Sequence, residues 1–235
     1  MASLLAAGRA TMHTAWQGYC DHLGRRPLAT KVVTGVVGTL IGDGIAQATA
    51  HMAERRRAAA RPGARRPRFQ YDAARAARLC LYAAAIGSPV GHYWFAFLDK
   101  NVFPGRMGHP GTALLKVALD QAIMAPAGMA LFYVAISLME GKRLDQAADV
   151  LAAKFGPTMA ANYLLWPAAN FVNFRFVPPE QRILYVNAVY IGWVSFLSTM
   201  AAEGGGAPRR ALAADAASDK TARLSPAGAG RPKAD

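Results

Sequence analysis

Long apolar runs, almost free of charged side chains, recur along this chain and limit what it can fold into. A helix of about 20 residues, rising about 1.5 Å per residue, crosses a hydrocarbon layer of about 30 Å. The four clearest runs, whose only charged or histidine side chains are Asp43, His92 and Asp120, cover residues 32–50, 79–98, 117–139 and 183–202. They predict an all-α, polytopic integral membrane helix bundle with about four transmembrane helices. A soluble all-helical bundle with buried core helices is the competing fold.

A fifth uncharged run covers residues 155–174 and is harder to assign. It contains two prolines and the side-chain amides of Asn162, Asn170 and Asn173. Polar groups at membrane depth are tolerated only where protein or water satisfies them. This run therefore predicts either a full span or an interfacial or re-entrant helix.

Polar stretches divide the chain into three parts. Residues 1–31 carry arginines and aromatic residues but no acid before Asp21, which favours an interfacial segment, with a mitochondrial presequence as the alternative. Residues 32–203 hold the predicted bundle, including an arginine-rich loop at 54–70. Residues 204–235 are poor in large apolar side chains and are expected to be disordered, and they do not end in a Ser-Lys-Leu peroxisomal address.

The composition excludes several classes of protein. With 53% hydrophobic residues and a net charge of +13, the chain is neither acidic nor wholly disordered. Cys20 and Cys80 are too few for a disulfide scaffold and lack the spacing of a zinc site. The sequence has no phosphate-binding glycine loop, nucleophile elbow or zinc-protease motif, so we expect no enzymatic activity, cofactor or metal. Lysine and arginine divide so evenly between the two sides of a four-span arrangement that they predict no orientation.

The loop at 54–70 is the most basic segment of the chain, with seven arginines from Arg55 to Arg68. A basic loop beside a membrane is attracted to the headgroups of anionic lipids. Nucleic-acid binding is the weaker alternative, because no aromatic residues alternate with the arginines. The lipid bilayer, and anionic lipids in particular, are therefore the expected partners, and a homo-oligomer remains open.

Ionisable side chains inside apolar runs are costly unless they are paired or hydrated, so they are candidates for function. Asp43 and Gln47 are four residues apart and therefore share one helix face. Lys116 and Asp120 have the same spacing, with Gln121 beside them. The second pair predicts either functional polar groups or a simple intrahelical ion pair at the interface.

The basic residues in and near the second apolar run each have two possible roles. Arg75 and Arg78 either extend to the lipid headgroups or turn inward to neutralise Asp43 or Asp120. His92 is expected to form hydrogen bonds inside the bundle rather than to bind a metal, because no second ligand stands at a suitable spacing.

Small residues and amides indicate where helices meet. Gly38 and Gly42 form one pair at four-residue spacing, and Gly87 and Gly91 form another around Pro89, which predicts a kink and close helix crossings. In the fifth run, one helix face carries Trp166, Asn170 and Asn173. The side chains of this face either form hydrogen bonds across helices or line a water-filled passage.

Ordered motifs between about Trp16 and Ser198 resemble a known family. They are Gly42-Asp43 with Gln47, Arg75 with Arg78, Pro89 with His92 and Trp94, Lys116 with Asp120, Gln121 and Pro126, Trp166-Pro167, Asn173-Phe174, Pro178, Arg182, Trp193 and Leu197-Ser198. On these residues the chain resembles the Mpv-seventeen family, which includes the peroxisomal membrane protein of about 22 kDa and relatives of the mitochondrial inner membrane. It departs from the family pattern at Asn170, which stands in place of a glutamine, and at Val194, which stands in place of an asparagine.

The resemblance implies a small membrane protein with about four spans, in the mitochondrial inner membrane or the peroxisomal membrane. Relatives are linked to mitochondrial DNA maintenance and reactive-oxygen metabolism and have been proposed to form channels. The expected function is a channel or pore for small solutes, favoured in the mitochondrial inner membrane. A non-conducting structural scaffold, held together by the same polar groups, is the alternative.

Overall fold

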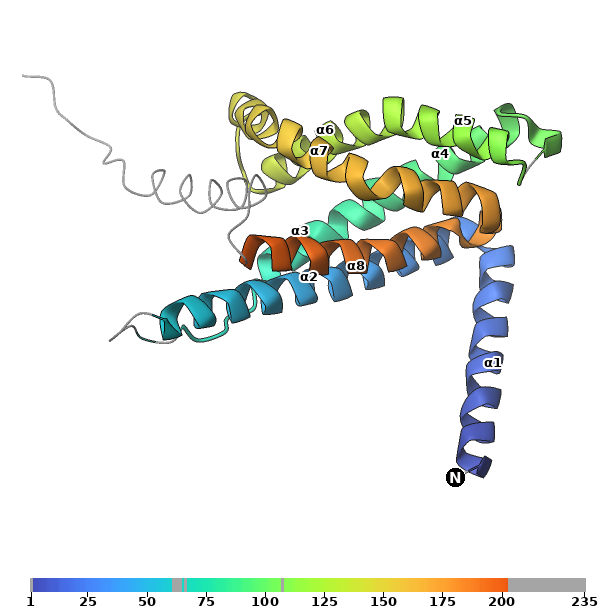
Figure 1. Ribbon diagram of the computed structural model, residues 1–235, viewed down its shortest axis with the longest axis horizontal. Coiled ribbons are helices and arrows are strands. Elements are labelled where there is room, and N and C mark those ends of the chain that lie inside the picture. The colour runs from blue at the N-terminus through green and yellow to red at the C-terminus, as the bar shows by residue number, and fades with distance from the viewer. Residues whose placement is uncertain (1, 61–64, 66, 107, 203–235) are drawn as a thin grey trace, which may run out of the picture.

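The computed structural model describes residues 2–60, 65, 67–106 and 108–202, with the backbone alone for 2–10 and 194–202. The regular structure of this part is helical and contains no strand (Figure 1). The predicted tail at 204–235 and part of the predicted loop, at 61–64 and 66, lie outside the described residues. The α-helices are α1 (Ala2–Arg25), α2 (Pro27–Ala59), α3 (Ala73–Tyr82), α4 (Ser88–Asn101), α5 (Pro110–Leu119), α6 (Ala125–Met139), α7 (Leu144–Phe176) and α8 (Arg182–Ala202).

The bundle has two layers joined by a crossing segment. Helices α2 and α8 lie side by side along much of their length, and α7 packs against α5 and α6 in the other layer (Figure 1). The segment from α3 to α4 contacts α2, and α3 also contacts α6. Short 3₁₀ turns, η2 (Pro104–Arg106) and η4 (Pro179–Gln181), stand in the connections before α5 and α8.

Two π-helical turns, η1 (Ala83–Gly87) and η3 (Asp120–Met124), lie inside otherwise continuous helices. Each ends two residues before a proline, Pro89 or Pro126. A proline ring clashes with the carbonyl group four residues earlier, and a wider π-helical turn relieves that clash. The kink that the sequence predicts at Pro89 therefore takes the form of a π-helical turn ahead of the proline.

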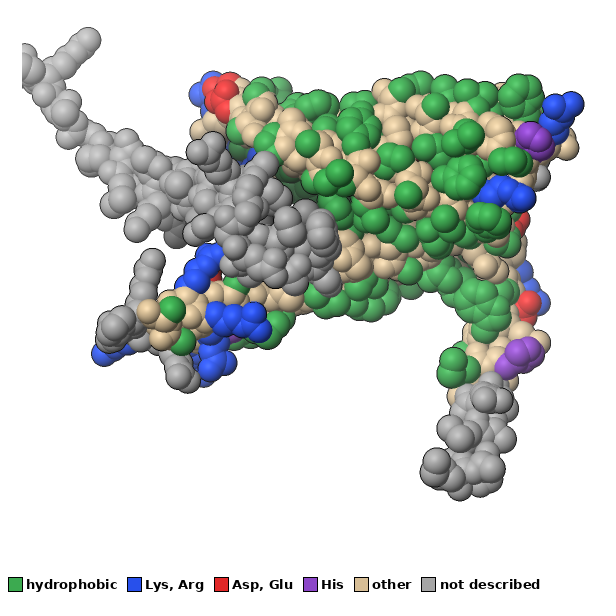
Figure 2. All heavy atoms as spheres, viewed as in Figure 1, with side chains coloured by type: hydrophobic (Ala, Val, Ile, Leu, Met, Phe, Trp, Pro, Cys, Tyr) green, Lys and Arg blue, Asp and Glu red, His purple; other side chains and the backbone are tan. Residues whose placement is uncertain are grey.

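Two helical segments are long and apolar enough to cross a membrane, Pro27–Ala59 and Pro110–Met139. Only 28% and 6% of their most apolar stretches are buried inside the bundle. The core helix of a soluble protein would be mostly buried, whereas here apolar side chains such as Leu114, Ile123 and Leu131 face outward. Figure 2 shows hydrophobic side chains over the flank of the bundle and charged groups mainly at its ends. A continuous apolar surface of this kind fits lipid.

The other predicted spans have a different outcome. The run 79–98 lies in the continuous helical segment formed by α3, η1 and α4, which is not one of the two segments that meet the criteria of length and apolarity. The run 183–202 lies in α8, whose side chains are described only as far as Trp193. Four transmembrane helices therefore remain a prediction, of which two segments meet the criteria of length and apolarity.

The fifth run lies within α7, a single helix of 33 residues that contains both Pro157 and Pro167. A re-entrant segment would have to turn back within the membrane, and α7 contains no such turn. The geometry is that of a long helix packed against α5 and α6.

Helix α1 leaves the bundle at a steep angle to the other helices (Figure 1). Its end is nevertheless attached to α2, because Leu23 is buried and the hydroxyl groups of Tyr19 and Thr34 lie 3.2 Å apart. If α2 crosses the bilayer, α1 runs along the membrane surface. The interfacial role of residues 1–31 stays a prediction.

The predicted loop at 54–70 begins as helix, because α2 continues to Ala59. Alanine and arginine are good helix formers, and the first proline of the segment is Pro62. Arg55, Arg56 and Arg57 therefore belong to the end of α2 rather than to an irregular loop.

Candidate functional site

The first polar cluster inside the bundle forms around Asp43 on α2. Its carboxylate is buried and accepts a hydrogen bond from Nε2 of Gln47 at 2.7 Å. Nε of Arg75, on α3, lies 3.0 Å from the other carboxylate oxygen. The prediction that Asp43 and Gln47 share a face is confirmed, and Arg75 turns inward to neutralise Asp43.

Backbone hydrogen bonds fix the position of Arg75. The side chain of Asp72 caps α3 by accepting from the backbone N–H of Arg75 at 2.8 Å. The backbone N–H of Asp72 donates in turn to Oε1 of Gln47 at 2.7 Å. Arg78, one turn further on, lies 3.8 Å from Glu140 at the end of α6 and does not reach Asp43 or Asp120.

The second cluster surrounds Asp120, the first residue of η3. Its buried carboxylate accepts hydrogen bonds from the indole N–H of Trp94 at 2.9 Å, from Asn170 at 2.6 Å and from Gln121 at 2.9 Å. Gln121 accepts another from Asn162 at 2.9 Å. These bonds join α4, η3 and α7 through neutral donors.

Of the two alternatives for Lys116 and Asp120, the intrahelical ion pair is wrong. Nζ of Lys116 instead donates to Asp99, at the end of α4, at 2.6 Å. The α-helix gives way to the π-helical turn at Asp120, and the Asp120 carboxylate is occupied by donors from α4 and α7. The four-residue spacing considers only contacts within one helix, so it could not predict these contacts between helices.

The third cluster centres on Asp99. Besides Lys116, its carboxylate accepts two hydrogen bonds from Nη1 of Arg182, the first residue of α8, at 2.5 Å. Both basic side chains are buried, and the guanidinium group of Arg182 lies 5.2 Å from the ring of Phe174. Asp99 was not singled out from the sequence because it directly follows an apolar run. Asp99 could have been found from Lys116 and Arg182, because each of these basic residues directly precedes an apolar run and needs an acid nearby to neutralise it.

His92 lies next to the start of α2. Its Nδ1 atom is 3.2 Å from Nζ of Lys31, which is buried. The prediction that His92 forms a hydrogen bond inside the bundle is confirmed. In the described part of the chain, no three His, Cys, Asp or Glu residues come together as metal ligands would.

The asparagines of α7 differ in their surroundings. Asn170 is bonded to Asp120, whereas Asn173 is fully buried and neither its amide nitrogen nor its oxygen has a hydrogen-bond partner. Two further buried atoms on α8 are also without a partner, Nε of Arg182 and Nδ2 of Asn187. Trp166, the third residue of the predicted face, is only partly buried.

Glycines on α2 allow α8 and the crossing segment to approach. A Cβ atom at Gly38 would lie 3.1 Å from Asn187, and one at Gly42 would lie 3.3 Å from Tyr190. A Cβ atom at Gly35 would collide with Oγ of Ser88. The predicted close contact at Gly38 and Gly42 is confirmed. The pair Gly87 and Gly91 is less crowded, with nearest atoms at 3.4 Å and 3.9 Å.

The remaining signature residues pack the same regions. Phe174 lies in the apolar core near Leu98 at the α4, α5 and α7 junction, and Trp193 is buried on α8. Pro126 follows η3, Pro167 lies inside α7, and Pro178 links α7 to η4.

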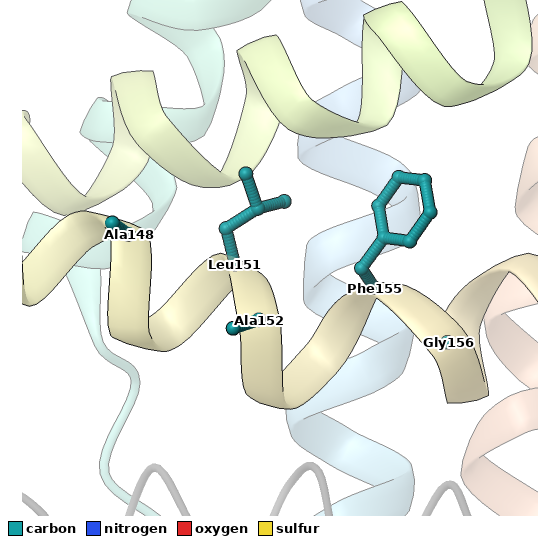
Figure 3. A pocket seen from close by; sticks show the side chains of 5 residues that line it. All are labelled: Ala148, Leu151, Ala152, Phe155 and Gly156. Atoms are coloured by element: carbon teal, nitrogen blue, oxygen red, sulfur yellow. The ribbon is translucent and has the colours of Figure 1, made fainter.

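Two surface hollows of the described chain are lined by apolar side chains. One, of about 400 Å³, lies on α7 between Ala148 and Gly156, where Leu151 and Phe155 point toward α6 (Figure 3). Another, of about 500 Å³, is lined by Pro89, Tyr93, Trp94 and neighbouring apolar residues. Of the candidate polar clusters, only Trp94 reaches either hollow, so in this conformation the polar groups meet at helix contacts.

The chain is similar to known proteins over most of its length. A family model described as Mpv17 / PMP22 family matches residues 137–198. The chain is 30% identical over 182 residues to PXMP2/4 family protein 4 of Dictyostelium discoideum, a match that covers 77% of this chain and 90% of that relative. It is 39% identical over 171 residues to Protein SYM1 of Mycosarcoma maydis, with 72% and 77% covered.

A third relative extends the pattern. The chain is 41% identical over 134 residues to Protein SYM1 of Eremothecium gossypii, with 56% of this chain and 73% of the relative covered. No solved structure matches the chain. The match to the Dictyostelium protein spans nearly the whole of that relative, and it agrees with the family-model match and with the resemblance that the motifs carry. The chain therefore belongs to the Mpv17 / PMP22 family.

Proposed function

We propose that this protein is a non-enzymatic pore for small solutes in the mitochondrial inner membrane. The observation that carries the proposal is the side chain of Asn173, which is 0% exposed and has no hydrogen-bond partner at either amide atom. An unpartnered buried amide costs about 1–3 kcal/mol. A state in which water or a polar solute reaches Asn173 removes that cost.

Asn173 lies between two of the polar clusters. On α7 it follows Asn170, which is bonded to Asp120, and precedes Phe174, whose ring lies beneath Arg182 of the Asp99 cluster. The unpartnered Nε of Arg182 and Nδ2 of Asn187 belong to α8, which packs against α7. Polar groups therefore continue from the Asp99 end of the bundle toward its middle.

The Asp43 cluster supplies polar groups toward the other end. At about 1.5 Å per residue, Asp43 lies roughly 24 Å along α2 from Pro27, while Lys31 lies roughly 6 Å along it. The side chain of Arg75 is 46% exposed although Asp43 is buried, so the pair reaches from the interior to the surface. The proposed path is this series of polar groups, closed in the present conformation by hydrogen bonds between the helices.

Conductance of the purified protein in a planar bilayer tests the pore. We expect discrete currents from the unmodified protein and a changed conductance or ion selectivity from the Asp43→Asn, Asp120→Asn double variant. Asp149→Asn, which alters an exposed carboxylate of α7, serves as the matched control and should conduct normally. Silence from folded protein, or equal currents from all three proteins, would contradict the proposal.

A non-conducting scaffold is the second candidate, and a specific observation favours it. Asp43, Asp99 and Asp120 each join different helices, and two surface hollows have apolar linings. Interhelical hydrogen bonds of this kind contribute about 0.6–2 kcal/mol each. A scaffold would lose stability and cellular abundance on replacement of Asp43 or Asp120 and would show no conductance.

The location is a separate part of the proposal. Membership of the Mpv17 / PMP22 family supports an organelle membrane. The mitochondrial inner membrane, and a role in reactive-oxygen metabolism or mitochondrial DNA maintenance, follow from the family resemblance. Cell fractionation with protease protection of the tagged protein tests the location. Recovery of the protein with peroxisomes would contradict this location. Protease cleavage at every tag position, in mitochondria with a ruptured outer membrane and an intact inner membrane, would also contradict it.

A further inference from the structure

The end of α2 and the segment that returns to α3 form a structured projection. Helix α2 continues for nine residues beyond the apolar run that ends at Ala50, and residues 67–72 lead back to α3. The rings of His51 and Phe69 contact each other, with centroids 5.2 Å apart. Gln47 and the backbone of Asp72 exchange hydrogen bonds of 2.7 and 3.2 Å. The described residues 51–60, 65 and 67–72 are called the basic arm below.

Aromatic residues indicate the depth of the basic arm in the membrane. Phe69 and Tyr71 are exposed, and Phe69 packs at the level of His51, directly after the apolar run. Exposed aromatic side chains at the edge of an apolar run are typical of the boundary between hydrocarbon and headgroups. The return segment therefore lies at this boundary.

The arginines of the basic arm lie just beyond that boundary. Arg55 to Arg57 follow His51 by four to six residues, which is about 6–9 Å along the helix. The headgroup layer on each side of a bilayer is about 5–8 Å thick. The guanidinium groups at the end of α2 are consequently at the depth of lipid phosphates.

The basic arm carries more positive charge than its own acids can neutralise. The side chains of Arg55, Arg56, Arg57, Arg65 and Arg68 are exposed. The acids of the arm are Glu54 and Asp72, and Asp72 is engaged in capping α3. Arginine binds phosphate with paired N–H donors, so an anionic phosphate is the complementary ligand.

We propose that the basic arm binds the phosphate groups of anionic lipids in the leaflet that it faces. This binding is independent of the pore, because the polar clusters of the bundle take no part in it. Each arginine near an anionic membrane surface contributes about fivefold to the preference for anionic lipid. Removing three of them should abolish most of the preference.

The experiment uses the full chain in nanodiscs that contain a lipid with a photoreactive group in its headgroup. Two probes of equal abundance are compared, an anionic phosphatidylglycerol analogue and a zwitterionic phosphatidylcholine analogue. Cross-linked peptides are identified by mass spectrometry. The test variant replaces Arg55, Arg56 and Arg57 by Gln, and the control variant replaces Arg25, Arg26 and Arg106, which lie at the other end of the bundle. Both triple variants remove the same charge, and thermal unfolding establishes that each is folded.

In the unmodified protein we expect the anionic probe to label peptides of 51–72 at least tenfold more than the zwitterionic probe. The preference should fall severalfold in 1 M NaCl and should be almost abolished in the arm variant, but it should stay unchanged in the control variant. Equal labelling by the two probes, or an unchanged preference in the folded arm variant, would overturn the proposal. If the arm shows no preference between the two lipids, and the protein in zwitterionic nanodiscs binds double-stranded DNA through the arm, the arm is a nucleic-acid surface instead. If the arm variant does not fold, Arg55→Gln alone is used, with a fivefold loss expected and no loss overturning the proposal.

Discussion

Asp99 and Arg182 form the contact that closes one end of the helix bundle. Both oxygens of the Asp99 carboxylate accept from Nη1 of Arg182 at 2.5 Å, although the two residues are 83 positions apart in the chain. Lys116 donates to the same carboxylate at 2.6 Å. One acid at the end of α4 thereby joins the last turn of α5 to the start of α8.

Asp99→Asn should destabilise the protein strongly. The substitution leaves Lys116 and Arg182 buried with their charges uncompensated, which costs about 3–5 kcal/mol in comparable pairs. Thermal unfolding in detergent should show a clear decrease in Tm, whereas Asp149→Asn, at an exposed position, should melt like the unmodified protein. A melting curve for Asp99→Asn that matches the control would mean that the cluster does not hold the bundle together.

Arg75 and Asp43 should behave as a coupled pair. Arg75→Gln leaves the buried Asp43 carboxylate without its cation, so this single variant should be less stable than the Arg75→Gln, Asp43→Asn double variant. Chemical unfolding of both single variants and the double variant measures the coupling free energy. Additive effects of the two substitutions would contradict the pairing.

Two glycines of α2 should respond oppositely to the same substitution. A side chain at Gly38 meets Asn187 of α8, whereas nothing lies within 4 Å of a Cβ atom at Gly44. Gly38→Ala should therefore lower Tm because the packed helices must move apart. Gly44→Ala should raise Tm slightly, since alanine favours a helix over glycine by about 1 kcal/mol. Equal shifts for the two variants would show that α2 and α8 do not pack as described.

Some of the site follows from local spacing. Asp43 and Gln47 are four residues apart on one helix and share a face by helical periodicity alone, so their contact could be predicted. The same rule failed at Lys116 and Asp120, because η3 alters the periodicity and each side chain has a partner on another helix. A contact such as that between Asp99 and Arg182 depends on how the chain folds back.

The helices illustrate the same limit. Apolar runs predicted α2 and the α5 to α6 segment, which are the segments that meet the criteria for spans. The sequence predicted a kink at Pro89, but not its form as the π-helical turn η1, which depends on how the helix accommodates the proline. The fifth run, with its prolines and asparagines, left open a full span or an interfacial or re-entrant helix, and α7 remains helical through Pro157 and Pro167 in its packing against α5 and α6.

The reactivity of a cysteine at position 173 tests the proposed path most directly. In a chain with Cys20→Ser and Cys80→Ser, Asn173→Cys is compared with Leu98→Cys, because both native side chains are fully buried. If Asn173 lies on a path for solutes, a small charged thiol reagent should modify Asn173→Cys in proteoliposomes and reduce its conductance, and Leu98→Cys should stay unmodified. Equal protection of both cysteines in folded, reconstituted protein would contradict the pore and favour the scaffold.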